Sequence, residues 1–241
     1  HWSVGWLAVL ILAVSLVVEK LAGEVTADHD VPIFLDAGLS LVLAYGPSLW
    51  WCRRVARRAG GWRQLGWAWH RFDAGWGPLT FAGALIAQVL VVSIAIELGI
   101  PFTSNVEVTD GNRTVPYVIA MILSACVAAP LVEEVLFRGV VLRGFAGHMH
   151  VVAAVAVQGA LFGCAHIDPS RGWGNIGLAL GLTSTGCALG LVAVLTRRLG
   201  APIVAHALLN GLVVILLLTG VTDDLRRDLD AVAGALVALV S

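Results

Sequence analysis

The sequence predicts an all-α fold, a polytopic bundle of helices that cross a membrane. Composition is the first observation: 59% of the 241 residues are hydrophobic and 13% are charged, whereas soluble domains carry about 25% charged residues. The mean hydropathy of +0.88 is the second. The third is the grouping of apolar residues into stretches close in length to the roughly 20 residues that a helix needs to span a bilayer.

The apolar stretches give the order of the spans. Seven are predicted, at residues 6–21, 31–51, 79–100, 115–134, 151–166, 176–195 and 202–218. The fifth is short and ends just before Asp168-Pro169. An eighth apolar stretch at 231–240 is too short to span unless the chain continues beyond Ser241.

Three regions follow from this pattern. Residues 1–114 hold the N-terminal spans with a basic, Trp-rich loop, and residues 115–220 form a core whose apolar helices contain polar residues. Residues 221–241 form a charged linker and an apolar C-terminal segment. Basic and aromatic residues also occur together in nucleic-acid-binding proteins. Between two spans they favour a cytoplasmic loop lying on anionic lipid, so the bilayer is the expected partner and no nucleic acid is expected.

Arginine placement predicts the orientation of the bundle. The basic loop, the region of Arg138 and Arg143, and the pair Arg197-Arg198 are expected on the cytoplasmic side, because cytoplasmic loops carry an excess of Lys and Arg. The N-terminus is then cytoplasmic. We expect an integral, multi-pass protein of a bacterial plasma membrane.

An acidic pair, Glu133-Glu134, interrupts the fourth span four and five residues before Arg138. Ionisable residues at membrane depth are costly and indicate a functional site by default. Glu134 and Arg138 are i,i+4 neighbours with the acid first, which favours an ion pair, whereas Glu133 points about 100° away round the helix. Pro130 is expected to kink this helix or to begin a new helical piece. A solvated helix end stays open as the alternative.

Two further polar pairs lie in apolar helices, each with four-residue spacing that places both side chains on one face. They are Phe162 with His166 and His206 with Asn210. A single histidine in a membrane helix is more often interfacial or hydrogen-bonded to a neighbouring helix. A carboxylate, two imidazoles and an amide on three helices, however, are the groups that peptide hydrolysis by an activated water requires.

Each group then has an expected role. Glu133 is the general base and His166 helps it to polarise the water, while His206 and Asn210 donate to the developing oxyanion. Glu134 and Arg138 are structural, and Phe162 packs the site. Zinc held by Glu133, His166 and His206 is the alternative, because a His₂Glu set with a water is typical of catalytic zinc sites. No H-E-x-x-H motif is present, so the metal-free site is favoured.

The ordered motifs E-E-x-x-x-R, F-x-x-x-H and H-x-x-x-N resemble those of the CPBP family, the CAAX proteases and bacteriocin-processing enzymes also called Abi proteins. All seven positions match, and the resemblance covers about residues 117–217. It implies that residues 115–220 are the catalytic core of an intramembrane endopeptidase. Eukaryotic members of the family trim prenylated CAAX proteins, and bacterial members are linked to bacteriocin maturation or self-immunity. The family is often labelled metalloprotease, although a metal-free, glutamate-activated water has been proposed for its prenyl-protein members.

The expected function is thus hydrolysis of a peptide or protein substrate at the membrane, lipidated or not. A non-proteolytic scaffold or bacteriocin-immunity factor on the same fold is the alternative, and a small transporter is a third. The proposed site also requires Glu133 and His166 to lie at the same depth in the membrane. Glu133 and His166 meet only if the fourth helix continues past Arg138 or the fifth extends beyond Pro169.

Overall fold

The structure is a computed structural model that describes residues 2–26, 31–103 and 114–219. Nine α-helices are found in this part of the chain: α1 (Trp2–Thr26), α2 (Ile33–Ala59), α3 (Asp73–Glu97), α4 (Val115–Met121), α5 (Ala129–Glu134), α6 (Leu142–Ala146), α7 (Val151–Cys164), α8 (Gly174–Thr196) and α9 (Gly200–Thr219). Two 3₁₀ turns, η1 (Trp62–Leu65) and η4 (Pro169–Arg171), and two π-helical segments, η2 (Ile122–Ala128) and η3 (Val135–Val141), lie between them. The predicted helical membrane bundle is confirmed.

Six helices of the described residues are long and apolar enough to cross a membrane: Ser3–Glu24, Ile33–Ala59, Asp73–Glu97, Val115–Ala146, Gly174–Thr196 and Gly200–Thr219. They correspond to six of the seven predicted spans. The predicted fifth span is the shorter apolar helix α7, whose 14 residues reach only about 21 Å. The stretch 231–240 and the rest of the region 221–241 lie outside the described residues.

Two helices extend beyond their apolar stretches. α2 runs eight residues past the predicted end at 51 and stops where Gly60 adopts a left-handed conformation with φ 96°. α3 begins at Asp73 rather than 79, and the Asp73 carboxylate accepts a hydrogen bond from the His70 N–H at 2.7 Å. Hydropathy detects only the membrane-facing part of a helix, so polar turns at its ends escape it.

The acidic pair lies within one long helical stretch, Val115–Ala146, that counts as a single span. α4, η2, α5, η3 and α6 follow one another without a break. The π-helical segment η2 gives way to α5 one residue before Pro130, so the hydrogen-bond register changes near the proline while the chain stays helical. At 1.5 Å per residue the 32 residues reach about 48 Å. The fourth helix therefore continues past Arg138, which is the first of the two arrangements that the site required.

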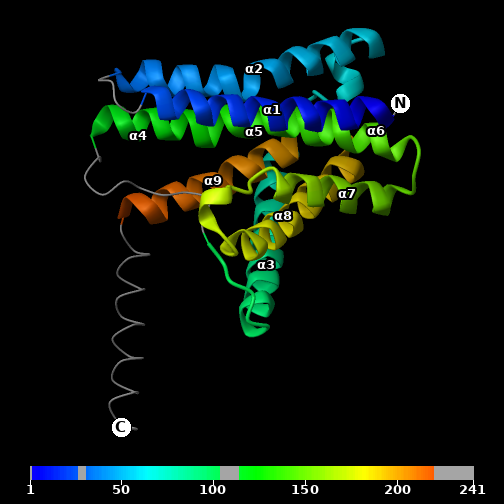
Figure 1. The fold of residues 1–241 in the computed structure, drawn as a ribbon. Coiled ribbons are helices and arrows are strands. Elements are labelled where there is room, and N and C mark those ends of the chain that lie inside the picture. The colour runs from blue at the N-terminus through cyan, green and yellow to red at the C-terminus, as the bar shows by residue number, and fades with distance from the viewer. Residues whose placement is uncertain (1, 27–30, 104–113, 220–241) are drawn as a thin grey trace.

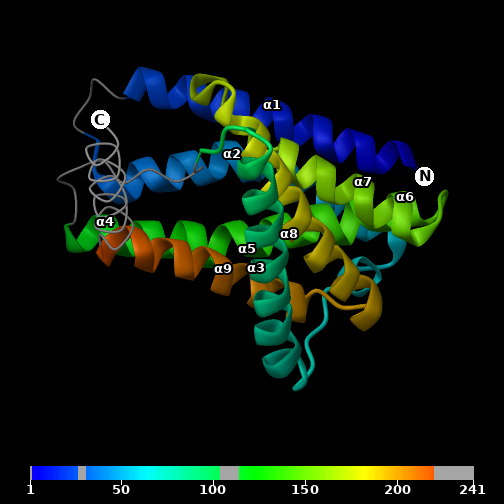
Figure 2. The same cartoon turned by 90° about the horizontal axis from the view of Figure 1, so that it is seen from below.

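The helices form two groups that meet at the site. α1, α2 and the helix from α4 to α6 run alongside one another on one side of the molecule, and α7, α8, α9 and α3 lie on the other (Figure 1). Seen from below, α3 crosses the direction of α4, α5 and α9 steeply (Figure 2). α3 packs against α8 and α9, and α9 contacts η2 and α5. The first three spans and the core are thus in extensive contact.

Glycines allow α7 and α8 to approach closely. A Cβ atom at Gly186 would lie 2.9 Å from the Cα of Gly159, and one at Gly163 would collide with the backbone and side chain of Thr183. Small residues of this kind let membrane helices pack backbone to backbone. The close approach brings the Gly186 carbonyl within reach of side chains that support the site.

The basic loop packs firmly on the core. Asp73 forms an ion pair of 2.9 Å with Arg198, and the Leu199 N–H donates to the Gly66 carbonyl at 2.9 Å. Six arginines of α2 and the loop remain exposed and form no ion pair with any described residue: Arg53, Arg54, Arg57, Arg58, Arg63 and Arg71. Exposed aromatic rings lie among them: Trp50, Trp62, Trp69, Phe72 and Trp76. We call these eleven residues the basic-aromatic surface.

Candidate active site

Glu134 and Arg138 form a fully buried ion pair. Arg138 Nη1 donates to Glu134 Oε1 at 2.8 Å, and both side chains have 0% exposure. Arg138 Nη2 donates to the Gly186 carbonyl at 3.2 Å, and the guanidinium lies 4.6 Å from the centre of the Phe162 ring. The predicted i,i+4 pair is confirmed, and the alternative of a solvated helix end is wrong.

Both histidines are oriented through Nδ1. His206 Nδ1 lies 2.9 Å from Glu134 Oε1, and His166 Nδ1 lies 2.8 Å from the Phe162 carbonyl oxygen. A carbonyl and a carboxylate only accept hydrogen bonds, so each Nδ1 carries the proton. In the neutral ring Nε2 then bears a lone pair. Sequence spacing does not reveal this contact of Glu134 with His206, because it depends on how α5 and α9 pack.

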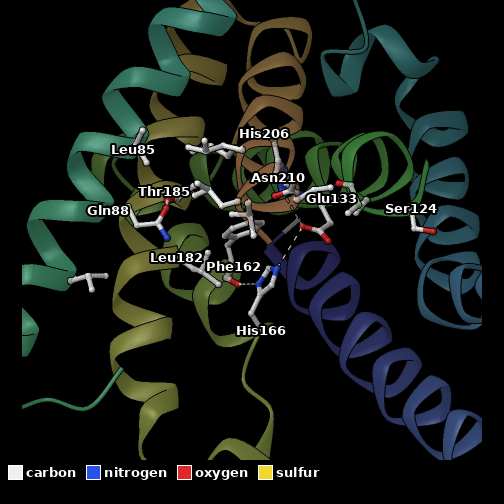
Figure 3. Close-up of a pocket in the computed structure, with 18 of the residues that line it drawn as sticks. Leu85, Gln88, Ser124, Glu133, Phe162, His166, Leu182, Thr185, His206 and Asn210 are labelled. Atoms are coloured by element: carbon white, nitrogen blue, oxygen red, sulfur yellow. Dashed lines mark hydrogen bonds and ion pairs between the residues drawn. The ribbon is translucent and has the colours of Figure 1, made fainter. Parts of the chain in front are cut away.

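Glu133 Oε2 is the point on which the two rings converge (Figure 3). His166 Nε2 and His206 Nε2 each lie 3.9 Å from it. This oxygen is buried and has no hydrogen-bond partner among the described residues. Leaving such an atom unpaired costs about 1–3 kcal/mol in a folded protein, so this oxygen can gain from binding a hydrogen-bond donor. The predicted meeting of Glu133, His166 and His206 is observed.

The other oxygen of Glu133 is held by a residue that the sequence analysis missed. Tyr45 Oη on α2 donates to Glu133 Oε1 at 2.6 Å. One tyrosine in an apolar span gives no periodic or motif signal, so only packing reveals this contact. The bond fixes the carboxylate so that Oε2 faces the histidines.

Phe162 and Asn210 occupy the places that their spacing predicted. The Phe162 ring packs against His166 and His206, with ring centres 4.8 Å and 5.7 Å apart. Asn210 lies one turn after His206 on α9, and its Nδ2 donates to the Ala125 carbonyl of η2 at 2.7 Å. One of its two N–H groups is thereby used. The second N–H of Asn210 is the one that would donate to an oxyanion, and this role of Asn210 stays a prediction.

Hydrogen bonds from Lys20 and Asn175 to Asp168 hold the loop that carries His166. His166 lies just beyond the end of α7, and Asp168 follows it two residues later. Lys20 Nζ of α1 donates a hydrogen bond to Asp168 Oδ1 at 2.7 Å. Asn175 Nδ2 donates to the Asp168 carbonyl at 2.6 Å, and its Oδ1 accepts from the Asp168 N–H at 3.0 Å. Hydrogen bonds from the Lys20 ammonium and from Ser170 hold the pKa of the Asp168 carboxyl well below its usual value.

The site opens into a cavity of about 610 Å³. Apolar side chains from α2, α3, η2, α8 and α9 form most of its wall, and Glu133, His166, His206 and Asn210 lie at one part of it. Gln88 of α3 and Thr185 of α8 line another part. A mostly apolar pocket with a few convergent polar groups is typical of a binding or catalytic site.

Zinc fits these residues poorly as they stand. With bonds of about 2.0–2.2 Å, two tetrahedral ligand atoms lie roughly 3.4 Å apart, whereas each imidazole Nε2 is 3.9 Å from Glu133 Oε2. Within the described residues no group of three or more His, Cys, Asp or Glu side chains is arranged to hold a metal ion.

Comparison with known proteins finds a match to the region that contains these residues. Residues 115–212 match the family model described as "Type II CAAX prenyl endopeptidase Rce1-like". These residues are therefore similar to those of CAAX proteases. "Putative membrane peptidase YdiL" of Bacillus subtilis (strain 168) is 25% identical over 156 residues, which cover 64% of this chain and 60% of that protein. The chain thus spans less than two thirds of the length of this relative. No solved structure matches the chain significantly.

The CAAX protease match includes all seven residues of the three motifs, from Glu133 to Asn210, and agrees with the resemblance inferred from them. Three residues of the site region lie outside it: Lys20, Tyr45 and Gln88. The N-terminal helices therefore supply contacts to the matched region that the three motifs do not contain.

Proposed function

We propose that the protein is an intramembrane endopeptidase that hydrolyses a peptide bond of a membrane-associated substrate with a water activated at Glu133. The observation that carries the proposal is the buried, unpaired Glu133 Oε2 at 3.9 Å from two imidazole nitrogens. Two acceptors 3.9 Å apart can both bind one water at about 2.8 Å, the usual length of such hydrogen bonds. The CAAX protease family match supports the reaction class.

Charge balance supports a protonated His206. Glu133 and Glu134 are two buried carboxylates, and Arg138 supplies one fixed positive charge. An uncompensated charge at membrane depth is costly. A second proton on His206 brings the four groups to net zero, and Glu134 Oε1 stabilises the resulting imidazolium through Nδ1 at 2.9 Å. Its Nε2 then becomes a hydrogen-bond donor, as an oxyanion site requires.

The reaction follows from these positions. Glu133 and His166 accept hydrogen bonds from the two O–H groups of the water, and the water oxygen attacks the substrate carbonyl carbon as one of its protons passes to Glu133. His206 Nε2–H, together with the second N–H of Asn210, donates to the oxyanion, an interaction worth about 2.7–4 kcal/mol per donor in other hydrolases. The C–N bond then breaks, and Glu133 returns the proton to the leaving amine. The products are an amine and a carboxylic acid, which ionises to the carboxylate by releasing the second water proton to solvent.

A lipidated substrate fits the cavity wall, which is largely apolar beyond the catalytic groups. The description of the matching family names prenyl endopeptidases, so a prenylated peptide is the first substrate to test. Non-lipidated membrane peptides form the second class.

The test uses the purified protein in nanodiscs with two fluorogenic peptides of equal sequence, one carrying an S-farnesyl cysteine. Wild type should cleave at least one and incorporate one ¹⁸O atom from labelled water into the new carboxylate. Glu133→Gln should remain folded and lose cleavage, because an amide cannot accept the proton. Turnover retained by Glu133→Gln would refute the proposal. If this variant also kept the protein's full cellular role, the scaffold or immunity alternative would be supported.

A further inference from the structure

The cavity contains a second polar pair that the proposed mechanism does not use. Thr185 Oγ1 of α8 donates to Gln88 Oε1 of α3 at 3.0 Å, and both residues line the cavity. Figure 3 shows this pair on the wall formed by α3 and α8, with Glu133 on the other side of the same cavity. Within residues 81–92 of α3, Gln88 is the single polar side chain.

The hydrogen bond between α3 and α8 involves only the oxygen of the Gln88 carboxamide and leaves its nitrogen, Nε2, without a role. Buried amides in membrane helices commonly hydrogen-bond to a neighbouring helix, and Gln88 Oε1 does so. Gln88 Nε2 has two N–H donors, and neither forms a hydrogen bond with a described residue. Gln88 is half-buried and lines the cavity, so these N–H groups are accessible to a ligand there.

Thr185 fixes which way the amide points. A helical threonine commonly donates to the carbonyl three or four residues earlier, but the 3%-exposed Thr185 donates to Gln88 instead. Because its hydroxyl proton occupies Oε1, Nε2 is directed away from Thr185. Gly181, one turn earlier on α8, lies beside this side chain, since a Cβ there would be in ordinary van der Waals contact with Gln88 Cγ at 3.5 Å and with Nε2 at 3.7 Å.

A peptide entering this cavity needs such a donor. An extended segment loses water from its main-chain carbonyls on entering an apolar space at membrane depth, and each carbonyl left unpaired costs free energy. Its apolar side chains can contact the leucine and valine side chains of the wall. A neutral amide matches a neutral carbonyl without burying a new charge.

We propose that Gln88 Nε2 donates a hydrogen bond to a main-chain carbonyl oxygen of the bound peptide, and that Thr185 holds the amide in position. The pair is a subsite of the same cavity and rests on the proposed function for the identity of its ligand. It places the peptide backbone between the α3–α8 wall and Glu133. Gln88 acts in binding, and the reacting atoms stay at Glu133.

The experiment measures binding, so that it does not depend on cleavage. The probe is a dansylated, S-farnesylated CAAX-type peptide, prepared also as a series in which one main-chain carbonyl oxygen at a time is replaced by sulfur, a weaker acceptor. Affinities are measured in nanodiscs in a Glu133→Gln background. Gln88→Leu removes the donor, Thr185→Val frees the amide, and Gln64→Leu makes the same change at an exposed site in η1.

Gln88→Leu should weaken binding about 3- to 10-fold, the effect of one net hydrogen bond, and Gln64→Leu should leave it unchanged. Replacing one particular carbonyl oxygen of the peptide by sulfur should weaken binding to Glu133→Gln. The same replacement should have no further effect when Gln88→Leu is added. Thr185→Val should give an intermediate loss. Unchanged affinity in Gln88→Leu, equal sulfur effects in both proteins, or no binding of any peptide would overturn the proposal.

Two outcomes separate this subsite from the proposed function. If wild type cleaves the peptide while Gln88→Leu leaves KM and affinity unchanged, the subsite is wrong and the peptidase stands. If wild type cleaves no peptide, but Gln88→Leu abolishes the effect of one sulfur replacement on binding, the subsite stands and the peptidase proposal is wrong. Loss of the Gln88→Leu effect in phospholipid-free detergent would identify a lipid ester carbonyl as the ligand and overturn the peptide assignment.

Discussion

His206 Nδ1 lies 2.9 Å from Glu134 Oε1, the same oxygen that accepts the hydrogen bond from Arg138. Glu134 is therefore more than the partner of an arginine, because it also fixes the orientation and tautomer of His206. The adjacent residue Glu133 faces the other nitrogen of the same ring at 3.9 Å. Two neighbouring carboxylates thus contact opposite ends of one imidazole.

Glu134→Gln should lower kcat by up to about 10⁴-fold, the loss seen when the carboxylate that orients the histidine of a Ser-His-Asp triad is made an amide. The neutral amide cannot stabilise the imidazolium that we propose at His206. It also leaves Arg138 buried without a counter-charge, which costs about 3–5 kcal/mol. Steady-state kinetics and thermal unfolding in nanodiscs measure the two effects. The double variant Glu134→Gln/Arg138→Met should recover stability but not kcat, and recovery of kcat would show that Glu134 acts only through Arg138.

Tyr45→Phe should lower kcat about tenfold and leave KM nearly unchanged. The change removes the 2.6 Å hydrogen bond to Glu133 Oε1, which is worth about 1.5–3 kcal/mol for a bond to a charged group, and the carboxylate is then free to rotate. The chain has one other tyrosine, Tyr117, which does not line the cavity. Tyr117→Phe is the matched control and should behave as wild type. A change in KM alone would assign Tyr45 to substrate binding.

Much of the site could be predicted because its chemistry is local in sequence. The four-residue spacings place Glu134 with Arg138 and Phe162 with His166 wherever the helices lie. The contacts of Tyr45 and of Glu134 with His206 could not be predicted, since they depend on the packing of α2 and α9 against α5. Sequence alone also left the depth of His166 open.

The fold was predictable to a similar extent. Hydropathy located six helices that can span a membrane, because the apolar length needed is set by the bilayer. It missed the polar ends of α2 and α3 and overestimated the reach of α7. It also could not show that π-helical segments would keep the chain helical on both sides of Pro130.

Cleavage should persist after removal of divalent metal. The separations of 3.9 Å around Glu133 Oε2 exceed the roughly 3.4 Å of tetrahedral zinc ligands. Protein dialysed against a chelator and analysed for zinc content should retain its kcat. Loss of activity that equimolar zinc restores would show that Glu133, His166 and His206 shift to bind the metal.

The Lys20–Asp168 contact should stabilise the protein in a pH-dependent way. Lys20 and Ser170 lower the pKa of Asp168 in the folded state, so the contact contributes stability above the unfolded value of about 3.9 and loses it as the pH falls through the folded value. The difference in Tm between wild type and Lys20→Met should be constant from about pH 5 to pH 8 and should shrink below about pH 4. A difference that stays constant to pH 3 would contradict an ionic contact.

The basic-aromatic surface should bind anionic lipid headgroups. Arg57 and Arg58 lie in the last turn of α2, exposed and without an ion pair among the described residues. Each arginine near an anionic membrane surface is worth about 1 kcal/mol, and exposed aromatic rings favour the interface. Arg57→Gln/Arg58→Gln should therefore lose much of the thermal stabilisation that wild type gains in nanodiscs with phosphatidylglycerol.

The charge-conserving variant Arg57→Lys/Arg58→Lys separates electrostatic attraction from a change in helix packing. It should keep the stabilisation, because both side chains retain their positive charge near the surface. Added salt should reduce the stabilisation of wild type and of this variant alike, since salt screens exposed charges. Equal stabilisation of the glutamine variant and wild type at low salt would mean that the surface does not recognise anionic lipid.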